Sequence, residues 1–455
     1  MPLILGAQSA TGAADVVTNS CRWNDGDSPK MSKTLGTATL NTKWTLNVWL
    51  KMGFGTQGIN VVYASSRTGT TGPYVNFLLD TNNKLNIYAP NISGANDFNY
   101  LTNRVFRDLG AWYMITVAMD TTLAAAGDRL RIYVNGTEET NFDTETNPTQ
   151  DDIYPANYTG YTFVAGARTD DSEYFDGYMA EFCLIDGQQL TPSSFGEFNE
   201  DSPTIWQPID VSGLTFGNNG FYLDFEDSAN LGNDANGGTD LTEVNFTAAD
   251  QATDTPSNNF CTGNPLDNYY QNAAWSEGNC NTLIATGVAV YSTGTMGMTA
   301  GKWYWEQQGT TNTGGFQVLP GIAGRMVTSA TEQELGEADD NWGYYSTTGN
   351  YYNDSTQTSY GDTFAADDII GVAVDLDNNK LYFAKNGVWQ NSGVPTSGAT
   401  GTGAISVMAA NLTTMGLYLP AWTGGWGGSV GHYGKWNFGG CSAFDVTSAA
   451  SDGNG

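Results

Sequence analysis

Two stretches far apart in the chain share the pattern of a β-hairpin that ends in an Asn-Gly turn. One is MITVAMDTTLAAAGDRLRIYVNGT, residues 114–137, and the other is IIGVAVDLDNNKLYFAKNGV, residues 369–388. Each holds two β-prone runs, and Asn-Gly is the strongest short signal for a two-residue hairpin turn. Because 455 residues exceed one ordinary core, the two stretches indicate two separate β domains.

Short β-prone runs continue along most of the chain, separated by clusters of Gly, Asn, Asp and Pro. KWTLNVWLKM places Trp44, Leu46, Val48 and Leu50 on one face, as expected of a half-buried strand. The 56 glycines suit many turns and few long helices. The sequence therefore predicts an all-β fold of two tandem antiparallel β-sandwiches.

The composition along the chain predicts five segments. We expect an N-terminal arm over residues 1–20, a first sandwich over 21–208, a linker over 209–268, a second sandwich over 269–445 and a tail over 446–455. The linker assignment rests on the polar composition of residues 226–268. The arm is too short for a domain and is a candidate docking segment.

Charge and cysteine usage exclude several classes of partner. With 17 basic and 48 acidic residues the net charge is −31, which would repel a nucleic-acid backbone. The five cysteines are scattered without a Cys-x-x-Cys pair, so neither a zinc site nor a disulfide framework is indicated. The opening MPLILGAQSATGA lacks a basic leader, and no apolar run reaches membrane-spanning length. We expect a chain made in the cytoplasm, without membrane insertion.

Several sequence segments resemble those of two known families. Residues 20–200, with WTLNVWLK, WYMITVAMD, LRIYVNGTE and YFDGYMAEFCLIDGQQLTP, resemble a concanavalin A-like LamG domain. Residues 275–440, with MTAGKWYWE, WGYYSTTGNYYND, SYGDTFAADDIIGVAVDLDNNKLYFAKNGV and WNFGG, resemble a SPRY domain.

This domain order, with LIDGQQLTPSSFGE between the two parts, is similar to structural proteins of tailed phages that infect marine bacteria. The resemblance implies two jelly-roll sandwiches on a virion surface, made in the host bacterial cytoplasm. It also implies other virion proteins as partners, and a homo-oligomer or many copies per particle.

The sequence favours no enzymatic activity. The only histidine, His432, lies among glycines without a nucleophile elbow, so a catalytic triad is not expected. Glu332, Glu334 and Glu337 have roughly the spacing of paired glycosidase carboxylates, but no strand pattern surrounds them. We predict a solvated loop there, and a polysaccharide-degrading glycosidase is the least favoured alternative.

No cofactor is expected, and calcium is the one ion that an acidic β-sandwich suggests. The segment DLDNNK lacks the glycine and glutamate of an EF-hand loop and is predicted to be a hairpin turn. The candidate calcium ligands are Asp170, Asp171, Glu173 and Asp176, in RTDDSEYFDG. We favour the interpretation of this segment as a solvated acidic loop, because acidic residues are abundant throughout the chain.

Two aromatic segments of the second sandwich are candidates for sugar binding, because aromatic rings stack on the apolar faces of sugars. The candidate residues are Trp422, Trp426, His432 and Tyr433 in one segment and Tyr344, Tyr345, Tyr351 and Tyr352 in the other. Aromatics on a glycine-rich loop either face outward or pin the loop to the sandwich, and the sequence leaves both open. Strand alternation allows at most half of the tyrosines to face outward.

Two functions fit these observations. The first is a lectin-like adhesin, a fibre or appendage component of a phage that binds host-surface glycans. The second is a capsid or tail decoration protein with a purely structural role. In either case other virion proteins must anchor the chain, because it lacks the heptads and β-helix repeats that build a shaft.

Overall fold

The structure is a computed structural model of the chain. It describes residues 16–53, 58–67, 74–93, 97–267, 270, 272–284, 290–311, 315–328, 334–424, 432–440 and 442–444. Within these ranges the chain forms two compact β units, and Asn259 and Phe260 mark the boundary between them. None of the helices in the described ranges has the length and apolar character needed to span a bilayer.

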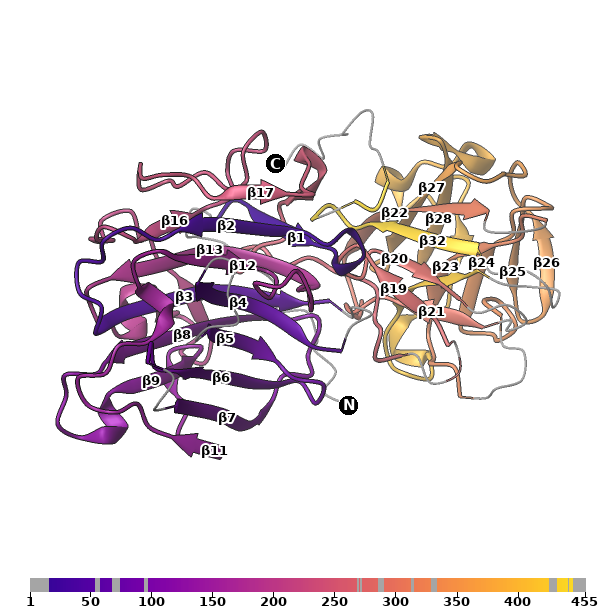
Figure 1. The fold of residues 1–455 in the computed structure, drawn as a ribbon. Coiled ribbons are helices and arrows are strands. Elements are labelled where there is room, and N and C mark those ends of the chain that lie inside the picture. The colour runs from indigo at the N-terminus through magenta and orange to yellow at the C-terminus, as the bar shows by residue number, and fades with distance from the viewer. Residues whose placement is uncertain are drawn as a thin grey trace. The chain divides into compact units, whose positions relative to one another are not determined.

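The first unit is a sandwich of two antiparallel sheets, each with eight strands in the described residues (Figure 1). One sheet has the order β10-β9-β8-β3-β13-β1-β18, and β16 also pairs with β13. Its strands are β1 (Ser20–Trp23), β3 (Lys43–Met52), β8 (Trp112–Asp120), β9 (Leu130–Val134), β10 (Thr137–Glu138), β13 (Gly177–Asp186), β16 (Phe221–Leu223) and β18 (Gln251–Ala252).

The second sheet of this sandwich has the order β11-β7-β6-β5-β4-β12-β2-β17. Its strands are β2 (Lys30–Thr34), β4 (Asn60–Arg67), β5 (Tyr74–Leu79), β6 (Lys84–Pro90), β7 (Asp97–Val105), β11 (Phe142–Thr146), β12 (Tyr161–Ala165) and β17 (Thr242–Val244). A separate hairpin joins β14 (Gly196–Phe198) to β15 (Trp206–Pro208).

Alternation along β3 fills the core of this sandwich as predicted, since Trp44, Leu46, Val48 and Leu50 all lie in the main hydrophobic cluster. The prediction of a half-buried strand was incomplete, because Thr45 on the opposite face is buried as well. Its hydroxyl donates to the carbonyl of Gln188 and accepts from a backbone N–H of the segment that follows β13. That segment therefore covers the outside of the sheet.

The segment expected to be a linker contributes strands to the first sandwich. Within residues 209–259, β16 pairs with β13, β17 with β2 and β18 with β1. The buried ammonium of Lys51 lies 2.5 Å from the carboxylate of Asp254, which also accepts a hydrogen bond from the Trp112 indole at 3.0 Å. Residues 209–259 are thus part of the folded unit, and the domain boundary lies later than residue 208.

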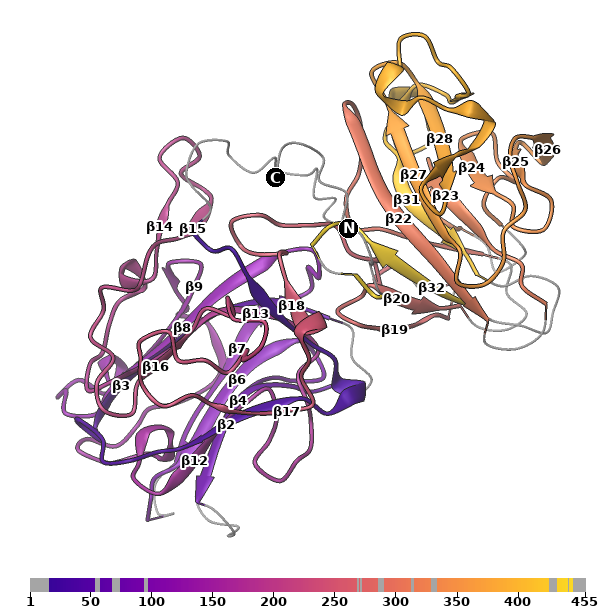
Figure 2. The same ribbon diagram turned by 90° about the horizontal axis from the view of Figure 1, so that it is seen from above.

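The second unit is also a sandwich of two antiparallel sheets, with eight and six strands in the described residues (Figure 2). The larger has the order β19-β20-β32-β22-β27-β28-β29, with β30 also on β28, and the smaller β21-β31-β23-β24-β25-β26. Strands of the larger sheet are β19 (Ala274–Ser276), β20 (Asn281–Leu283), β22 (Lys302–Thr311), β27 (Ile369–Asp375), β28 (Lys380–Lys385), β29 (Val388–Trp389), β30 (Ile405–Ser406) and β32 (His432–Asn437). Those of the smaller are β21 (Tyr291–Thr293), β23 (Leu319–Ala323), β24 (Asn341–Tyr344), β25 (Asn350–Asn353), β26 (Thr356–Ser359) and β31 (Leu419–Thr423).

Helical structure in the described residues consists of single 3₁₀ turns. They are η1 (Asp25–Asp27), η2 (Ala126–Asp128), η3 (Pro155–Asn157), η4 (Pro192–Ser194), η5 (Ala248–Asp250), η6 (Gln390–Ser392), η7 (Pro395–Ser397) and η8 (Ala410–Leu412). The all-β prediction of two tandem antiparallel jelly-roll sandwiches is confirmed.

The two Asn-Gly turns have the same local structure. Asn135 and Gly136 have φ of 47° and 76°, and Asn386 and Gly387 have φ of 48° and 78°. Positive φ at both central residues is the signature of the two-residue turn that fits the twist of a hairpin. In each turn the asparagine oxygen also accepts a 2.8 Å hydrogen bond from the backbone of the preceding hairpin.

Candidate functional site

The predicted aromatic site of the second sandwich is largely part of the core. Trp422, Tyr344, Tyr345 and His432 are between 0% and 4% exposed. Trp422 is a residue of β31 and packs against Gly434 of β32 in the other sheet, since a Cβ atom on Gly434 would lie 2.4 Å from its indole nitrogen. These four residues therefore cannot stack on a sugar, and Trp422 is a core residue of a strand.

The remaining aromatic candidates are only partly accessible. Tyr351, Tyr352 and Tyr433 are half-buried, and Tyr351 and Tyr352 pack against the main hydrophobic cluster of this sandwich. Trp426 lies outside the described residues. The structure thus does not assemble the predicted set into one binding surface.

His432 packs inside the second sandwich, where it is 1% exposed. Its Nε2 accepts a hydrogen bond from the backbone N–H of Gln317 and lies 2.9 Å from the carbonyl oxygen of Gly315. Burial lowers the pKa of this imidazole below its ordinary value. The side chain is a neutral core group.

Three of the four predicted calcium ligands make other contacts. Asp171 pairs with Lys30 and Glu173 with Arg168, while Asp170 accepts a hydrogen bond from Ser172 at 2.6 Å. Asp176 is fully buried, and within the described ranges no three carboxylate, histidine or cysteine side chains converge as metal ligands would. The structure does not support the calcium prediction, because the basic side chains compete for these carboxylates.

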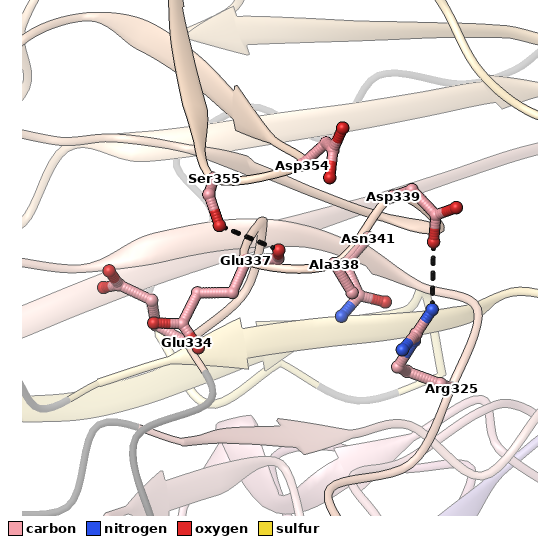
Figure 3. Close-up of a pocket in the computed structure, with 8 residues that line it drawn as sticks. All are labelled: Arg325, Glu334, Glu337, Ala338, Asp339, Asn341, Asp354 and Ser355. Atoms are coloured by element: carbon pink, nitrogen blue, oxygen red, sulfur yellow. Dashed lines mark hydrogen bonds and ion pairs between the residues drawn. The ribbon is translucent and has the colours of Figure 1, made fainter.

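A pocket of about 480 Å³ lies at one end of β23 and β24 in the second sandwich (Figure 3). Its lining residues are Arg325, Glu334, Glu337, Ala338, Asp339, Asn341, Asp354 and Ser355. The sequence predicted a solvated loop at Glu334 and Glu337, but Glu334 is only 4% exposed. The loop instead folds back as one wall of the pocket, and Glu332 lies outside the described residues.

Backbone contacts hold the acidic loop in place. The hydroxyl of Ser355 donates to the carbonyl of Glu337 at 3.1 Å (Figure 3). The side-chain amide of Asn353 donates to the carbonyl of Asp339 at 3.0 Å. The β25–β26 turn thereby fixes the opposite wall.

Arg325 is the single basic group among the lining residues, and it is already paired. Its guanidinium lies 2.5 Å from Asp340 and 3.0 Å from Asp339. Burial alone would raise the pKa of Asp340, but the hydrogen bonds from Arg325 and the Thr414 backbone outweigh it and hold that pKa below its ordinary value. The pocket therefore has an acidic character.

A second polar surface lies on the first sandwich, on the side of β5, β6 and β7 that faces away from the core. Asn76 lies opposite Tyr88, and Tyr88 lies opposite Asn99. Asn86 occupies the adjacent row of the same face, and Tyr74 stands one step along β5 from Asn76. We call these five residues the amide face.

The amide face combines an accessible ring with hydrogen-bond acceptors. Tyr74 is 42% exposed, and its ring centroid lies 6.1 Å from that of Tyr88. The Asn76 amide donates to the Tyr88 hydroxyl at 2.9 Å. The Oδ1 atoms of Asn86 and Asn99 are buried and have no hydrogen-bond partner in the described part of the chain. Since buried polar atoms are normally satisfied, these two unpaired oxygens set this face apart from an ordinary sheet surface.

The ion pair of Arg168 and Glu173 borders the amide face. Burial raises the pKa of Tyr88, and the positive charge of Arg168 opposes that rise. The loop predicted to bind calcium thus forms one edge of a polar surface. Alternation was the signal for this face, because Asn76 and Asn86 alternate with core residues of β5 and β6.

Family models match both parts of the chain. Residues 25–194 match the concanavalin A-like lectin/glucanases superfamily, and residues 302–412 match the SPRY domain. The chain therefore contains a concanavalin A-like domain followed by a SPRY domain, which confirms the two domain resemblances. No curated protein matches the sequence significantly.

Several solved structures are similar to parts of the chain. The SPRY domain of human HERC1 has 17% identity and a TM-score of 0.30, covering 39% of this chain and 97% of its own. The heptameric SAP-like pentraxin from Limulus polyphemus has 14% identity and a TM-score of 0.29, covering 40% of this chain and 80% of its own. A candidate carbohydrate-binding protein from Bacteroides ovatus has 15% identity and a TM-score of 0.34, covering 50% of this chain and 58% of its own.

Proposed function

We propose that this chain is a non-catalytic carbohydrate-binding protein on the surface of a phage virion, where it attaches the particle to glycans of the host cell. The observation that carries the binding role is the amide face, with an exposed ring beside two unsatisfied amide oxygens. The virion setting rests on the resemblance of the domain order and of the segment LIDGQQLTPSSFGE to structural proteins of tailed phages. Other virion proteins are the proposed anchor.

The chemistry of the amide face suits a sugar. Hydroxyl groups of a pyranose donate hydrogen bonds, and the unpaired Oδ1 atoms of Asn86 and Asn99 would accept them once the side chains that cover them shift aside. The apolar face of the same ring stacks on Tyr74. A neutral hydrogen bond contributes about 0.5–1.5 kcal/mol net, so one such site binds weakly. Many copies on one particle would raise the overall affinity through multivalency.

The proposal includes no bond cleavage. The only histidine of the sequence is 1% exposed, which places its imidazole poorly to serve as a base for a nucleophile at the surface. Glu334 and Glu337 both line the pocket of the second sandwich. Substitution of these two glutamates therefore tests whether the protein cleaves a polysaccharide. Release of reducing ends from a host polysaccharide, lost in Glu334→Gln or Glu337→Gln, would overturn the non-catalytic assignment.

Binding to a panel of neutral and acidic polysaccharides by affinity electrophoresis tests the adhesin role. We expect Tyr74→Ala to weaken binding at least about tenfold, equivalent to about 1.4 kcal/mol. Phe198→Ala is the matched control, because Phe198 is an aromatic residue of the same sandwich with 46% exposure and lies outside the amide face. An intact protein that retains no polysaccharide would refute the adhesin role and favour a purely structural decoration protein.

A further inference from the structure

The larger sheet of the second sandwich has an outward face with an unusual set of residues. Along β22 the side chains of Trp305 and Gln307 are buried toward the core. Tyr304, which lies between Trp303 and Trp305 in the sequence, is 52% exposed. Alternation puts Glu306 on the same side as Tyr304. This face lies over β22, β27, β28 and β29, which run side by side (Figure 2).

Strand register places small residues at the centre of this face. Glu306 lies opposite Gly371, and Gly371 lies opposite Ala384 on the next strand. A Cβ atom on Gly371 would lie 2.9 Å from the hydroxyl oxygen and 3.1 Å from the Cε2 atom of Tyr304. The Tyr304 ring therefore lies along the sheet over Gly371. In this orientation the flat face of the ring is turned toward solvent.

A second aromatic residue extends this surface. Trp389 lies opposite Ala384, and its ring centroid is 6.1 Å from that of Tyr304 with 64° between the planes. Val388 beside it is 67% exposed. Exposed apolar area of this kind does not contribute to folding, because it is not removed from water.

Hydrogen-bonding groups adjoin the two rings. One oxygen of Glu306 accepts from the Tyr304 hydroxyl at 2.9 Å, and the other accepts from the amide of Asn437 on β32 at 3.0 Å. These two contacts fix the orientation of the carboxylate. A carboxylate offers about four acceptor positions, so both oxygens keep capacity for further donors.

We propose that Tyr304, Trp389, Glu306 and Asn437 form a second carbohydrate-binding site, which takes a neutral pyranose unit of a polysaccharide chain. The rings receive the apolar face of the sugar, and Glu306 and Asn437 receive its hydroxyl groups. This inference rests on the proposed glycan-binding function and adds a site on the other sandwich.

The charge of the molecule selects a neutral sugar over an acidic one. The net charge of −31 repels anionic polymers, and Glu306 adds a carboxylate at the site itself. A protein partner would meet a mixed surface, because the Glu306 carboxylate lies beside Tyr304 and is hydrogen-bonded to the amide of Asn437 on β32. The alternation of ring and acceptor fits an amphipathic sugar ring better.

The test compares the full chain as wild type, Tyr74→Ala, Tyr304→Ala and the double variant, together with two further variants. With the amide face weakened by Tyr74→Ala, residual retention by neutral polysaccharides should come from the second site. We expect Tyr304→Ala to reduce that residual binding about tenfold and Glu306→Gln to reduce it as well. Leu412→Ala is the control, since Leu412 is 67% exposed on η8 of the same sandwich and lies outside the site. Thermal unfolding of each variant verifies the fold.

Three outcomes would contradict the proposals, and each identifies which proposal fails. Wild-type protein that binds no polysaccharide would refute the proposed function itself. Wild-type binding with residual retention unchanged by Tyr304→Ala would refute only the second site. If Tyr304→Ala instead abolishes self-association in sedimentation experiments without any change in polysaccharide binding, the face is an interface between copies and the proposal is wrong.

Discussion

Replacement of Glu181 by glutamine should remove a large pH dependence from the stability of the first sandwich. Glu181 is 4% exposed and has φ of 50°, at the point where the pairing of β13 with β3 shifts register. The Tyr222 hydroxyl lies 2.8 Å from both of its oxygens. Burial raises its pKa above the ordinary 4.5, the hydrogen bond from Tyr222 lowers it, and the negative charges of Asp224, Glu226 and Asp210 raise it, so that the pKa is about 8.

The sign of the effect follows from proton binding. Between pH 4.5 and 8 the folded state retains the proton of Glu181 and the unfolded state has released it. Because the unfolded state binds fewer protons, stability falls as the pH rises, and the contribution is complete below the unfolded pKa and lost as pH passes through the folded pKa. With 1.36 kcal/mol for each unit of pKa difference, the loss between pH 5 and pH 9 is on the order of 4 kcal/mol.

Hydrogen exchange at increasing urea concentrations, read by mass spectrometry on peptides of β13, measures this free energy locally. Peptides of β22 in the second sandwich provide an internal reference. Wild-type protein should lose about 4 kcal/mol more than Glu181→Gln between the two pH values. The exposed Glu145→Gln should behave as wild type. Parallel pH profiles for wild type and Glu181→Gln, within about 1 kcal/mol, would refute the assignment of a neutral buried carboxyl group.

Three further perturbations follow from the structure. Lys51→Met leaves the buried carboxylate of Asp254 without its cation, so it should destabilise the first sandwich by about 3–5 kcal/mol and increase proteolysis within residues 245–259; unchanged proteolysis would contradict the role of this pair. Trp422→Ala should lower the unfolding free energy of the second sandwich by about 3–5 kcal/mol, measured by denaturant titration, because the residue is fully buried; a selective loss of sugar binding with wild-type stability would show that it faces outward. Removal of calcium with EDTA should leave the unfolding temperature unchanged, because Asp171 and Glu173 are paired with basic side chains; a clear fall in that temperature would restore the calcium prediction.

The sequence predicted hairpins and longer strands well, but it did not predict the shortest strands. The two Asn-Gly hairpins form as expected, because positive φ at an Asn-Gly pair is set by the residues themselves. The turn at DLDNNK is also a hairpin turn, and Asp375 there accepts from the Asn378 backbone and pairs with Lys302. Strands β16, β17 and β18 were missed, because three residues or fewer carry no measurable alternation.

The site residues depended on contacts that local pattern does not contain. Trp422 is buried because Gly309 and Gly434, on two neighbouring strands, leave room for its indole. Glu334 lies in a pocket wall because the β25–β26 turn folds against its loop. Tyr304 could have been identified, since placing Trp303 and Trp305 on one face of β22 puts the residue between them on the other.

The decisive measurement is the retention of the intact protein by neutral polysaccharides, compared between wild type and the Tyr74→Ala, Tyr304→Ala double variant. Wild-type protein should be retained and the double variant should not, while Phe198→Ala with Leu412→Ala should leave retention intact. Equal retention of the wild-type protein and the Tyr74→Ala, Tyr304→Ala variant, or no retention of either, would contradict the claim that these two sandwich faces bind sugars.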